Sequence, residues 1–134
     1  MNTAEKLNHF LAYYGRRLGL NLGLKNGVCA LVRDRKEIAI VELPPDSDCV
    51  IFHRRLEDLK DVSENYLRTL LALNFEMDAM RGCWLAMDGD DSLRLCSQQP
   101  LAALDAAGFS DMLNAFIIQA GEVDEFLAES RRVA

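Results

Sequence analysis

Several residue types and patterns are scarce in this chain. Its 134 residues include two histidines, three prolines and one tryptophan, and its four cysteines form no Cys-x-x-Cys pair. No apolar run approaches the roughly 18 residues of a membrane-spanning helix, so we expect no membrane insertion. Glu5, Lys6 and His9 interrupt the first periodic stretch, which argues against a signal peptide. These absences predict a cytoplasmic protein.

The few cysteines and histidines also argue against a metal centre. The cysteines, which all fall in predicted strands, are Cys29, Cys49, Cys83 and Cys96. A zinc site needs clustered ligands, whereas these thiols are far apart in sequence, and His9 and His53 do not complete a set. We interpret the cysteines as buried, reduced thiols that pack as small hydrophobes, and we expect no metal.

Basic residues are fewer than acidic residues in this chain. With 15 Lys and Arg against 21 Asp and Glu, the formal net charge is −6. A protein that tracks nucleic-acid phosphates gathers Lys and Arg, and the pairs Arg54-Arg55 and Arg131-Arg132 are too short for that. We expect no nucleic-acid partner. Half of the residues are apolar, so residues 1–134 have enough hydrophobic material for a single domain with its own core.

The sequence does not assemble the polar groups of an active site. The serines at predicted caps and turns are Ser63, Ser92, Ser97 and Ser110, and none lies in a nucleophile elbow. The acidic turn from Asp88 to Asp91 lacks the central glycine and final glutamate of a calcium loop. The glycines at 15, 19 and 23 precede no Gly-Lys-Ser or Gly-Lys-Thr. We therefore expect no catalytic residue and no cofactor, and a protein that is not an enzyme.

The amino-terminal half reads as one helix followed by three strands. Asn2 and Glu5 have the spacing of a capping box, and apolar residues then recur at helical steps. Two β-branched runs joined by a charged turn are typical of a hairpin with both faces covered, and a third strand follows Pro44-Pro45. The predicted ranges are a helix over 3–18 and strands over 28–32, 38–43 and 49–53.

The carboxy-terminal half reads as a hairpin between helices. Asp61 or Ser63 caps a helix that runs to about Met77, and the Asp-Gly at 88–89 indicates a hairpin with strands over 83–87 and 92–97. Pro100 opens a short helical turn that Gly108 ends, and Ser110 caps the last helix. The element order is thus α-β-β-β-α-β-β-α, an α+β fold with an antiparallel sheet.

The helix over 63–77 carries more apolar surface than one core contact needs. Its apolar residues cover an arc of about 200°, roughly twice the width of an ordinary amphipathic stripe. The hypothesis is that one side of this helix and the strand beside it form a homodimer interface; the alternative is a helix buried centrally in a monomer. The interface residues predicted on this basis are Leu70, Leu73, Asn74, Trp84 and Leu85.

The same region carries a family resemblance, and the resemblance spans most of the chain in element order. The residues that carry it are Leu70-Leu71, Asn74, Gly82, Leu85-Ala86-Met87-Asp88, Leu93, Leu95, Pro100-Leu101 and Leu104-Asp105. They resemble the signature of the class I type III secretion chaperones, small acidic bacterial proteins that escort secreted virulence effectors. The resemblance implies the same α+β order, a homodimer in the bacterial cytoplasm, and an effector protein as partner.

The function predicted from the residues and the resemblance is binding of an effector's amino-terminal segment, which stays extended, soluble and competent for export without ATP. Grooves on the first helix and the strands would receive the segment, lined by Phe10, Tyr14, Leu18, Leu31, Ile40 and Ile51. Two alternatives remain open. These side chains could be ordinary core, or the protein could be a small α+β ligand-binding protein or enzyme with a pocket between the first helix and the sheet.

Overall fold

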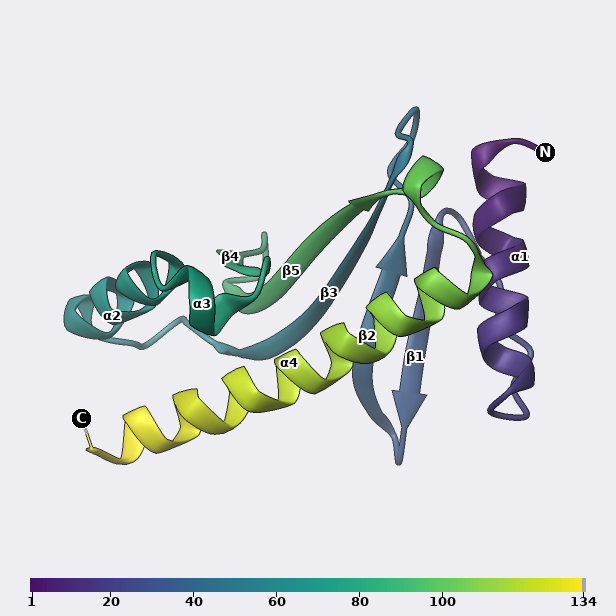
Figure 1. Ribbon diagram of the computed structural model, residues 1–134. Helices are drawn as coiled ribbons and strands as arrows, with labels where there is room; N and C mark the ends of the chain where they lie inside the picture. The colour runs from purple at the N-terminus through teal and green to yellow at the C-terminus, as the bar shows by residue number, and fades with distance from the viewer. Residues whose placement is uncertain (134) are drawn as a thin grey trace.

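The computed structural model describes residues 1–133, so Ala134, the last residue of the predicted domain 1–134, lies outside the described residues. The elements in chain order are α1 (Thr3–Arg16), β1 (Val28–Arg33), β2 (Lys36–Glu42), β3 (Cys49–Asp58), α2 (Glu64–Asn74), α3 (Met77–Met80), β4 (Trp84–Met87), β5 (Ser92–Pro100), the 3-10 helix η1 (Leu101–Ala103) and α4 (Ala106–Val133). The predicted α+β fold with this order is confirmed, and α3 is added to it (Figure 1). The predicted helical turn after Pro100 is η1, but Gly108 does not end it, because Gly108 lies within α4.

All five strands form one antiparallel sheet in the order β1-β2-β3-β5-β4. The ten-residue β3 lies at its centre and pairs with β2 on one side and with β5 on the other. The β4–β5 hairpin is attached through β5 alone, so β1 and β4 are the two edge strands.

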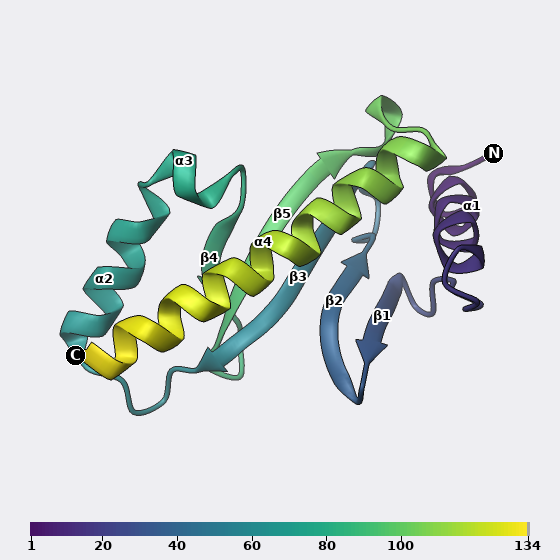
Figure 2. The same cartoon turned by 60° about the horizontal axis from the view of Figure 1, so that its bottom comes forward.

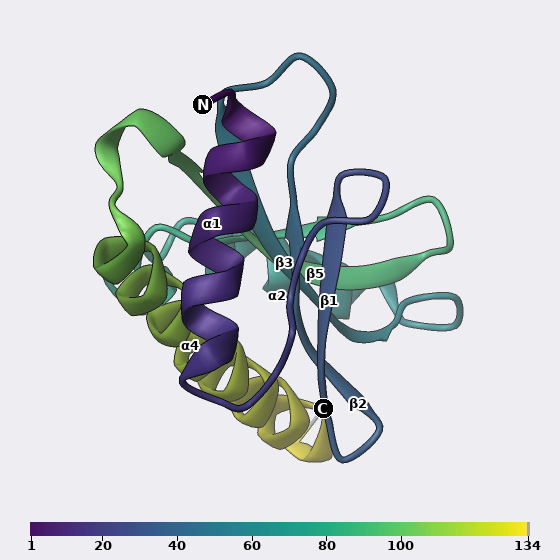
Figure 3. The same ribbon diagram turned by 90° about the vertical axis from the view of Figure 1, so that its right-hand side faces the viewer.

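The helices α1 and α4 lie on the same side of the sheet (Figure 3). Phe52 of β3 points to this side, where its ring contacts Phe109 and Phe116 of α4 at centroid distances of 5.7 and 5.8 Å. Phe10 of α1 contacts Phe109 at 5.6 Å. Aromatic pairs of this kind contribute about 0.5–1.5 kcal/mol each beyond their buried area, so the four rings join both helices to the sheet.

Residues that alternate with this core point to the opposite side of the sheet. Ile51 and His53 flank Phe52 along β3 and are half-buried, and Ile40 of β2 is the register partner of His53. Because successive strand side chains point to opposite faces, Ile40, Ile51 and His53 share the face away from α1 and α4. We call it the uncovered sheet face.

Helix starts follow the predicted capping chemistry at two of three places. Asn2 Oδ1 accepts a hydrogen bond from the Glu5 N–H at 2.8 Å, and Ser63 Oγ accepts one from the Tyr66 N–H at 3.1 Å, so Ser63 is the cap of α2. The prediction that Ser110 caps the last helix is wrong. Asp105 Oδ1 accepts from the Gly108 N–H at 2.7 Å, and α4 therefore begins at Ala106.

Some element ends also differ from the predictions. α1 ends at Arg16, before Leu18, and α2 ends at Asn74 because the chain turns before the separate helix α3. β3 continues five residues beyond the predicted end at His53, to Asp58, because it stays paired with β5. In this extension Arg54 pairs with Asp124 of α4 at 3.6 Å, and Arg55 Nε donates to Ser92 Oγ of β5 at 3.0 Å.

Candidate functional site

An apolar patch lies on α2 and the neighbouring strand β4. Leu67, Leu71 and Phe75 follow one stripe of α2 at four-residue steps, and Met87 of β4 lies beside them. Their exposed fractions are 39%, 71%, 78% and 60%. We call these four residues the α2 patch. Large side chains this exposed and this close together are typical of an interaction surface rather than of a solvated helix.

A cleft of about 300 Å³ opens within the α2 patch, between α2 and β4. Leu67, Leu71 and Met87 form its rim, while Leu70 and Leu85 form its floor and are buried. The patch thus combines protruding side chains with a concave surface.

The predicted dimer-interface residues all lie in this region but differ in exposure. Leu70 and Leu85 are buried, Leu73 and Asn74 are half-buried, and Trp84 is 40% exposed. Leu71 and Phe75, which the prediction did not include, are more exposed than any of the five predicted residues. Their place in the wide apolar arc of α2 is the sequence signal that could have identified them.

Asn74 fixes α2 to the edge of β4. Its Oδ1 accepts the Leu85 N–H at 2.7 Å, and its Nδ2 donates to the Leu85 carbonyl at 3.1 Å. The amide therefore pairs with Leu85 as a neighbouring strand would, on the side of β4 that faces away from β5. This edge of the sheet is occupied at its middle by a side chain.

The β1 edge is different. The N–H and C=O of Val28 bond the C=O and N–H of Lys25 at 3.1 and 2.8 Å, which shows that these groups point away from β2. Main-chain groups of successive strand residues point to opposite sides, so those of residues two apart point to the same side. The N–H and C=O of Ala30 therefore also point away from β2. The Ala30 and Val32 side chains are exposed. Lys25 therefore occupies the outward main-chain groups of Val28, and those of Ala30 are available to another strand.

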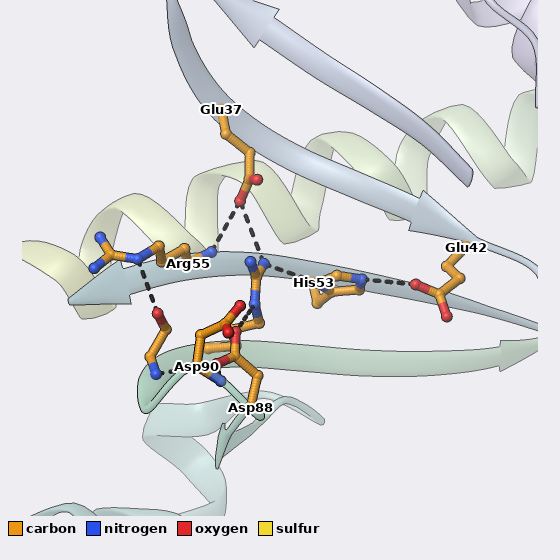
Figure 4. Close-up of polar contacts among 8 residues, drawn as sticks. Glu37, Glu42, His53, Arg55, Asp88 and Asp90 are labelled. Carbon is orange, nitrogen blue, oxygen red and sulfur yellow. Dashed lines mark hydrogen bonds and ion pairs between the residues drawn. The ribbon is translucent and has the colours of Figure 1, made fainter. Parts of the chain in front are cut away.

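The uncovered sheet face carries a network of charged side chains (Figure 4). At its centre Arg94 of β5 donates from Nε to Asp88 at 2.7 Å and from Nη1 to His53 Nδ1 at 3.1 Å. A longer contact of 3.5 Å joins Nη1 to Glu37 of β2. His53 Nε2 lies 3.1 Å from Glu42, so the network crosses from β5 through β3 to β2.

These contacts determine the chemistry of the network. Because an arginine N–H can only donate, His53 Nδ1 accepts and His53 Nε2 carries the hydrogen that Glu42 receives. The Arg94 hydrogen bond, with the Ser92 and Asp90 N–H groups, lowers the pKa of Asp88 from 3.8 to about 2. Every charge here has a partner within the sheet, so the network stabilises strand pairing and leaves the apolar residues around it available for contact.

The six predicted partner-binding residues are not brought together by the fold. Phe10, Tyr14 and Leu31 are buried on the helix side of the sheet, where the Tyr14 hydroxyl donates to Asn114 of α4 at 2.7 Å. Leu18 is exposed after the end of α1. The two residues on the uncovered sheet face are Ile40 and Ile51. The sheet lies between Ile40 and Ile51 on one face and the three buried residues on the other. Phe10 and Tyr14 are buried because α4 covers the amphipathic stripe of α1.

The alternative function requires a pocket between α1 and the sheet. The recess that corresponds most closely to it lies at the start of α1. It measures about 610 Å³ and is bordered by the loops around Asn26 and Pro45. Asn8, which lines it, already accepts the Leu24 N–H at 2.7 Å, and Asp46 is the one titratable residue in its lining. A single carboxylate supplies no acid–base pair, so this recess has the chemistry of a binding surface rather than of an active site.

Residues 1–133 hold four free cysteine thiols, of which Cys29 is buried and the other three are half-buried. No three His, Cys, Asp or Glu side chains gather there in a metal-binding arrangement. Burial raises the pKa of Cys83 to about 11, which keeps its thiol protonated and unreactive. None of the helices in this part of the chain has the length and hydropathy of a membrane span.

Known proteins share this fold and its sequence pattern. The model of the Tir chaperone protein (CesT) family matches residues 9–123. No curated protein sequence matches the chain. The ExsC-ExsE complex contains a similar chain, with a TM-score of 0.75, 19% identity, and coverage of 94% of this chain and 93% of that one.

Two further structures are similar. The HopA1-SchA chaperone-effector complex has a TM-score of 0.71 and 16% identity over 92% of this chain and 93% of that one. The ExoU-SpcU heterodimer from the type III secretion system of Pseudomonas aeruginosa has a TM-score of 0.66 and 18% identity over 90% and 93%. At these identities the likeness shows a shared fold.

Proposed function

Because this chain belongs to the Tir chaperone protein (CesT) family, we propose that it is a cytoplasmic homodimer that binds the amino-terminal segment of a secreted effector, its client. The family match confirms the resemblance to type III secretion chaperones. The similar structures named above are chains from complexes, and one is described as a chaperone-effector complex. The observation that carries the proposal is the pair of unpartnered surfaces, the α2 patch and the β1 edge.

The α2 patch supports the homodimer. Phe75, the residue directly after α2, is 78% exposed and continues the stripe of Leu67 and Leu71, which border the cleft. A patch that holds both a protrusion and a recess is self-complementary, which a two-fold interface requires. A stable interface of about 1,600 Å² in total would cover one side of α2 in each copy.

The β1 edge supports binding of an extended client segment. Main-chain hydrogen bonds from Ala30 onwards give affinity for any strand, and the side chains nearby give selectivity. β4 is less suited to this role because Asn74 already bonds both main-chain groups of Leu85. Ile40 and Ile51 on the uncovered sheet face extend the apolar surface that the client contacts.

The energetics of such binding require no ATP. Ordering an extended segment costs conformational entropy, and strand pairing with apolar contacts offsets that cost at equilibrium. The formal charge of −6 keeps a protein with exposed apolar surfaces soluble and favours a basic client.

Co-expression with the protein encoded by the neighbouring gene tests the proposal. We expect a secreted protein to copurify with the chain in buffer without nucleotide and to release only on unfolding. The control is the Ala30→Pro variant, which removes one outward N–H of β1 and should retain much less client. Failure of the wild-type chain to retain any secreted protein would refute the chaperone function.

A further inference from the structure

A recess opens where β2 and β3 separate near the β1–β2 turn. The register of the two strands runs from Glu42–Ile51 to Ile40–His53, and from Arg54 onwards β3 pairs with β5. β2 and β3 therefore diverge towards the turn (Figure 2). The space between them measures about 700 Å³ and extends to Asp124 of α4. We call it the hairpin recess, and neither the α2 patch nor Ala30 on the β1 edge is part of its lining.

Two carboxylates in the lining are already engaged by the chain itself. Glu37 Oε2 accepts the Arg55 N–H at 3.0 Å, so a side chain takes the place of a strand contact across the gap (Figure 4). The same oxygen lies 3.5 Å from Arg94 Nη1. On the α4 side, Asp124 pairs with Arg54 at 3.6 Å. These carboxylates therefore do not neutralise the other cations of the recess.

The remaining cations of the lining lack a carboxylate partner. Arg33, Lys36 and Arg55 are exposed, and none of them forms an ion pair within the part of the chain that the structure describes. The Arg55 Nε donates to the Ser92 hydroxyl at 3.0 Å instead. Asp34 is the one carboxylate of the described lining outside the ion pairs. The hairpin recess thus has an excess of positive charge on a chain whose formal net charge is −6.

Two of these cations face each other directly. Arg33 and Lys36 are register partners at the end of β1 and β2, and like charges in this position repel each other. A second like-charged register pair, Arg55 and Arg94, is accompanied by Glu37, whose carboxylate contacts both residues. The described residues place no such carboxylate on Arg33 or Lys36. An anion from a partner would remove this repulsion, so the pair favours an acidic ligand.

The rest of the lining favours an acidic peptide over other anions. Ile38 and Leu56 are half-buried in the recess, and their apolar surface suits a carboxylate that is followed by an apolar side chain rather than an inorganic anion. A nucleic acid needs cations along a track, whereas these cations gather at one end of a hairpin on an acidic protein. The volume lies within the range of about 300–1,000 Å³ that is typical of ligand sites.

We propose that the hairpin recess binds an acidic peptide segment, with its carboxylates between Arg33 and Lys36 and an apolar side chain against Ile38. In a chaperone this segment belongs to the client. Arg33 lies on the same strand as Ala30, about 10 Å further along, so a client strand that pairs at Ala30 can carry acidic residues to the recess. Acidic residues at this position fix the register of a client that is otherwise basic. The inference rests on the proposed function for its biological occupant, while the binding itself is testable without a client.

The test uses the peptide acetyl-Ser-Glu-Leu-Glu-Leu-Ser-amide and the full chain, labelled for amide and isoleucine-methyl NMR. We expect peptide-dependent shifts of the Ile38 methyl and of the Arg33 and Lys36 amides, with the Ile51 methyl unchanged. Binding should weaken as salt is added, because the charges are exposed. Replacing both glutamates of the peptide with glutamine should weaken binding about threefold to tenfold, as expected for two exposed ion pairs. Replacing both leucines with asparagine should weaken it as well.

Three variants complete the test. Arg33→Gln with Lys36→Gln removes the facing cations and should weaken peptide binding about threefold to tenfold. Arg17→Gln with Lys60→Gln removes two exposed cations outside the recess, so it is the control matched for net charge and should bind as the wild type does. Arg33→Glu puts opposite charges on the facing positions, so it should raise the urea midpoint while it abolishes peptide binding. A purely structural role of Arg33 predicts that both are lost.

Four results would overturn the inference. They are an absence of shifts at Ile38 at millimolar peptide, equal binding of the glutamate and glutamine peptides, equal losses in the two double variants, and tighter binding of a single-stranded oligothymidylate than of the peptide. The last would make the recess a nucleic-acid site. A chain that retains a secreted client but fails these tests refutes the recess only, whereas one that binds the peptide but retains no client refutes the chaperone function.

Discussion

The side-chain amide of Asn74 forms hydrogen bonds with both the N–H and the C=O of Leu85, at 2.7 and 3.1 Å. One residue thereby joins α2 to the edge strand β4 and occupies the main-chain groups that another strand would use. The arrangement makes the two edges of the sheet unequal and leaves β1 as the edge suited to strand addition.

Loss of this amide should destabilise the fold. Asn74→Ala removes two hydrogen bonds and leaves the N–H and C=O of the buried Leu85 without partners, so we expect the free energy of unfolding to fall by about 1–3 kcal/mol. Urea denaturation measures the change, and faster exchange of the Leu85 amide would locate it. Asn65→Ala, an exposed substitution on the same helix, is the control and should change stability little. Equal stability of the two variants would contradict the role of Asn74.

Self-association should depend on the α2 patch. Leu71→Asp puts a charge at a 71% exposed position on the rim of the cleft, and burying that charge in an interface is unfavourable. Sedimentation equilibrium should show two chains per particle for the wild type at micromolar concentration and one for the variant. Leu20→Asp, at a 47% exposed position outside the patch, is the control and should stay dimeric. A wild-type mass of 15.1 kDa would refute the dimer.

Client binding should depend on the main chain of β1. Ala30→Pro removes an N–H that points away from β2, so the sheet should survive while strand addition is lost. We expect at least about a tenfold loss of client affinity by isothermal titration calorimetry, the equivalent of about 1.4 kcal/mol. Ala30→Val keeps the N–H and should bind normally. If the proline variant binds the client as tightly as the valine variant, the client pairs elsewhere.

The Asp88–Arg94 contact should give stability that depends on pH. The native pKa of Asp88, about 2, lies below its ordinary value of 3.8, so the ionised carboxylate stabilises the fold above pH 3.8. That contribution disappears as the pH falls from 3.8 through about 2. Asp88→Asn should lower stability at pH 7 and flatten the acid limb of the stability curve. Asp90→Asn, whose carboxylate is exposed, should leave both nearly unchanged; identical acid limbs for all three proteins would contradict the assignment.

Local sequence signals predicted the elements well because their causes are local. Asn2 and Ser63 cap helices with their own side chains, and the Asp-Gly turn joins β4 to β5 directly. Long-range partners were not predictable in this way. The strand predicted over 49–53 ends at His53, yet Glu57, four residues later, is buried and pairs with Arg131 of α4 at 2.8 Å. α4 runs along the sheet towards the α2 end of the molecule, which a local pattern does not indicate (Figure 2).

In the candidate site, too, local features were predictable and long-range contacts were not. The apolar arc of α2 predicted the region that carries the α2 patch, because the excess of apolar residues is a property of one helix. The stripe on α1 looked equally available, but Phe10 lies against Phe109, a residue almost a hundred positions away. Periodicity shows that a face is apolar and does not show which element covers it.

Limited proteolysis of the copurified complex, with mass spectrometry of the protected client fragment, tests the central claim most directly. The proposed function predicts one protected stretch at the amino terminus of the client, without added helical signal in circular dichroism, and its loss with Ala30→Pro but not with Ala30→Val. A protected fragment from a folded interior domain of the client, or no protected fragment at all, would contradict the account.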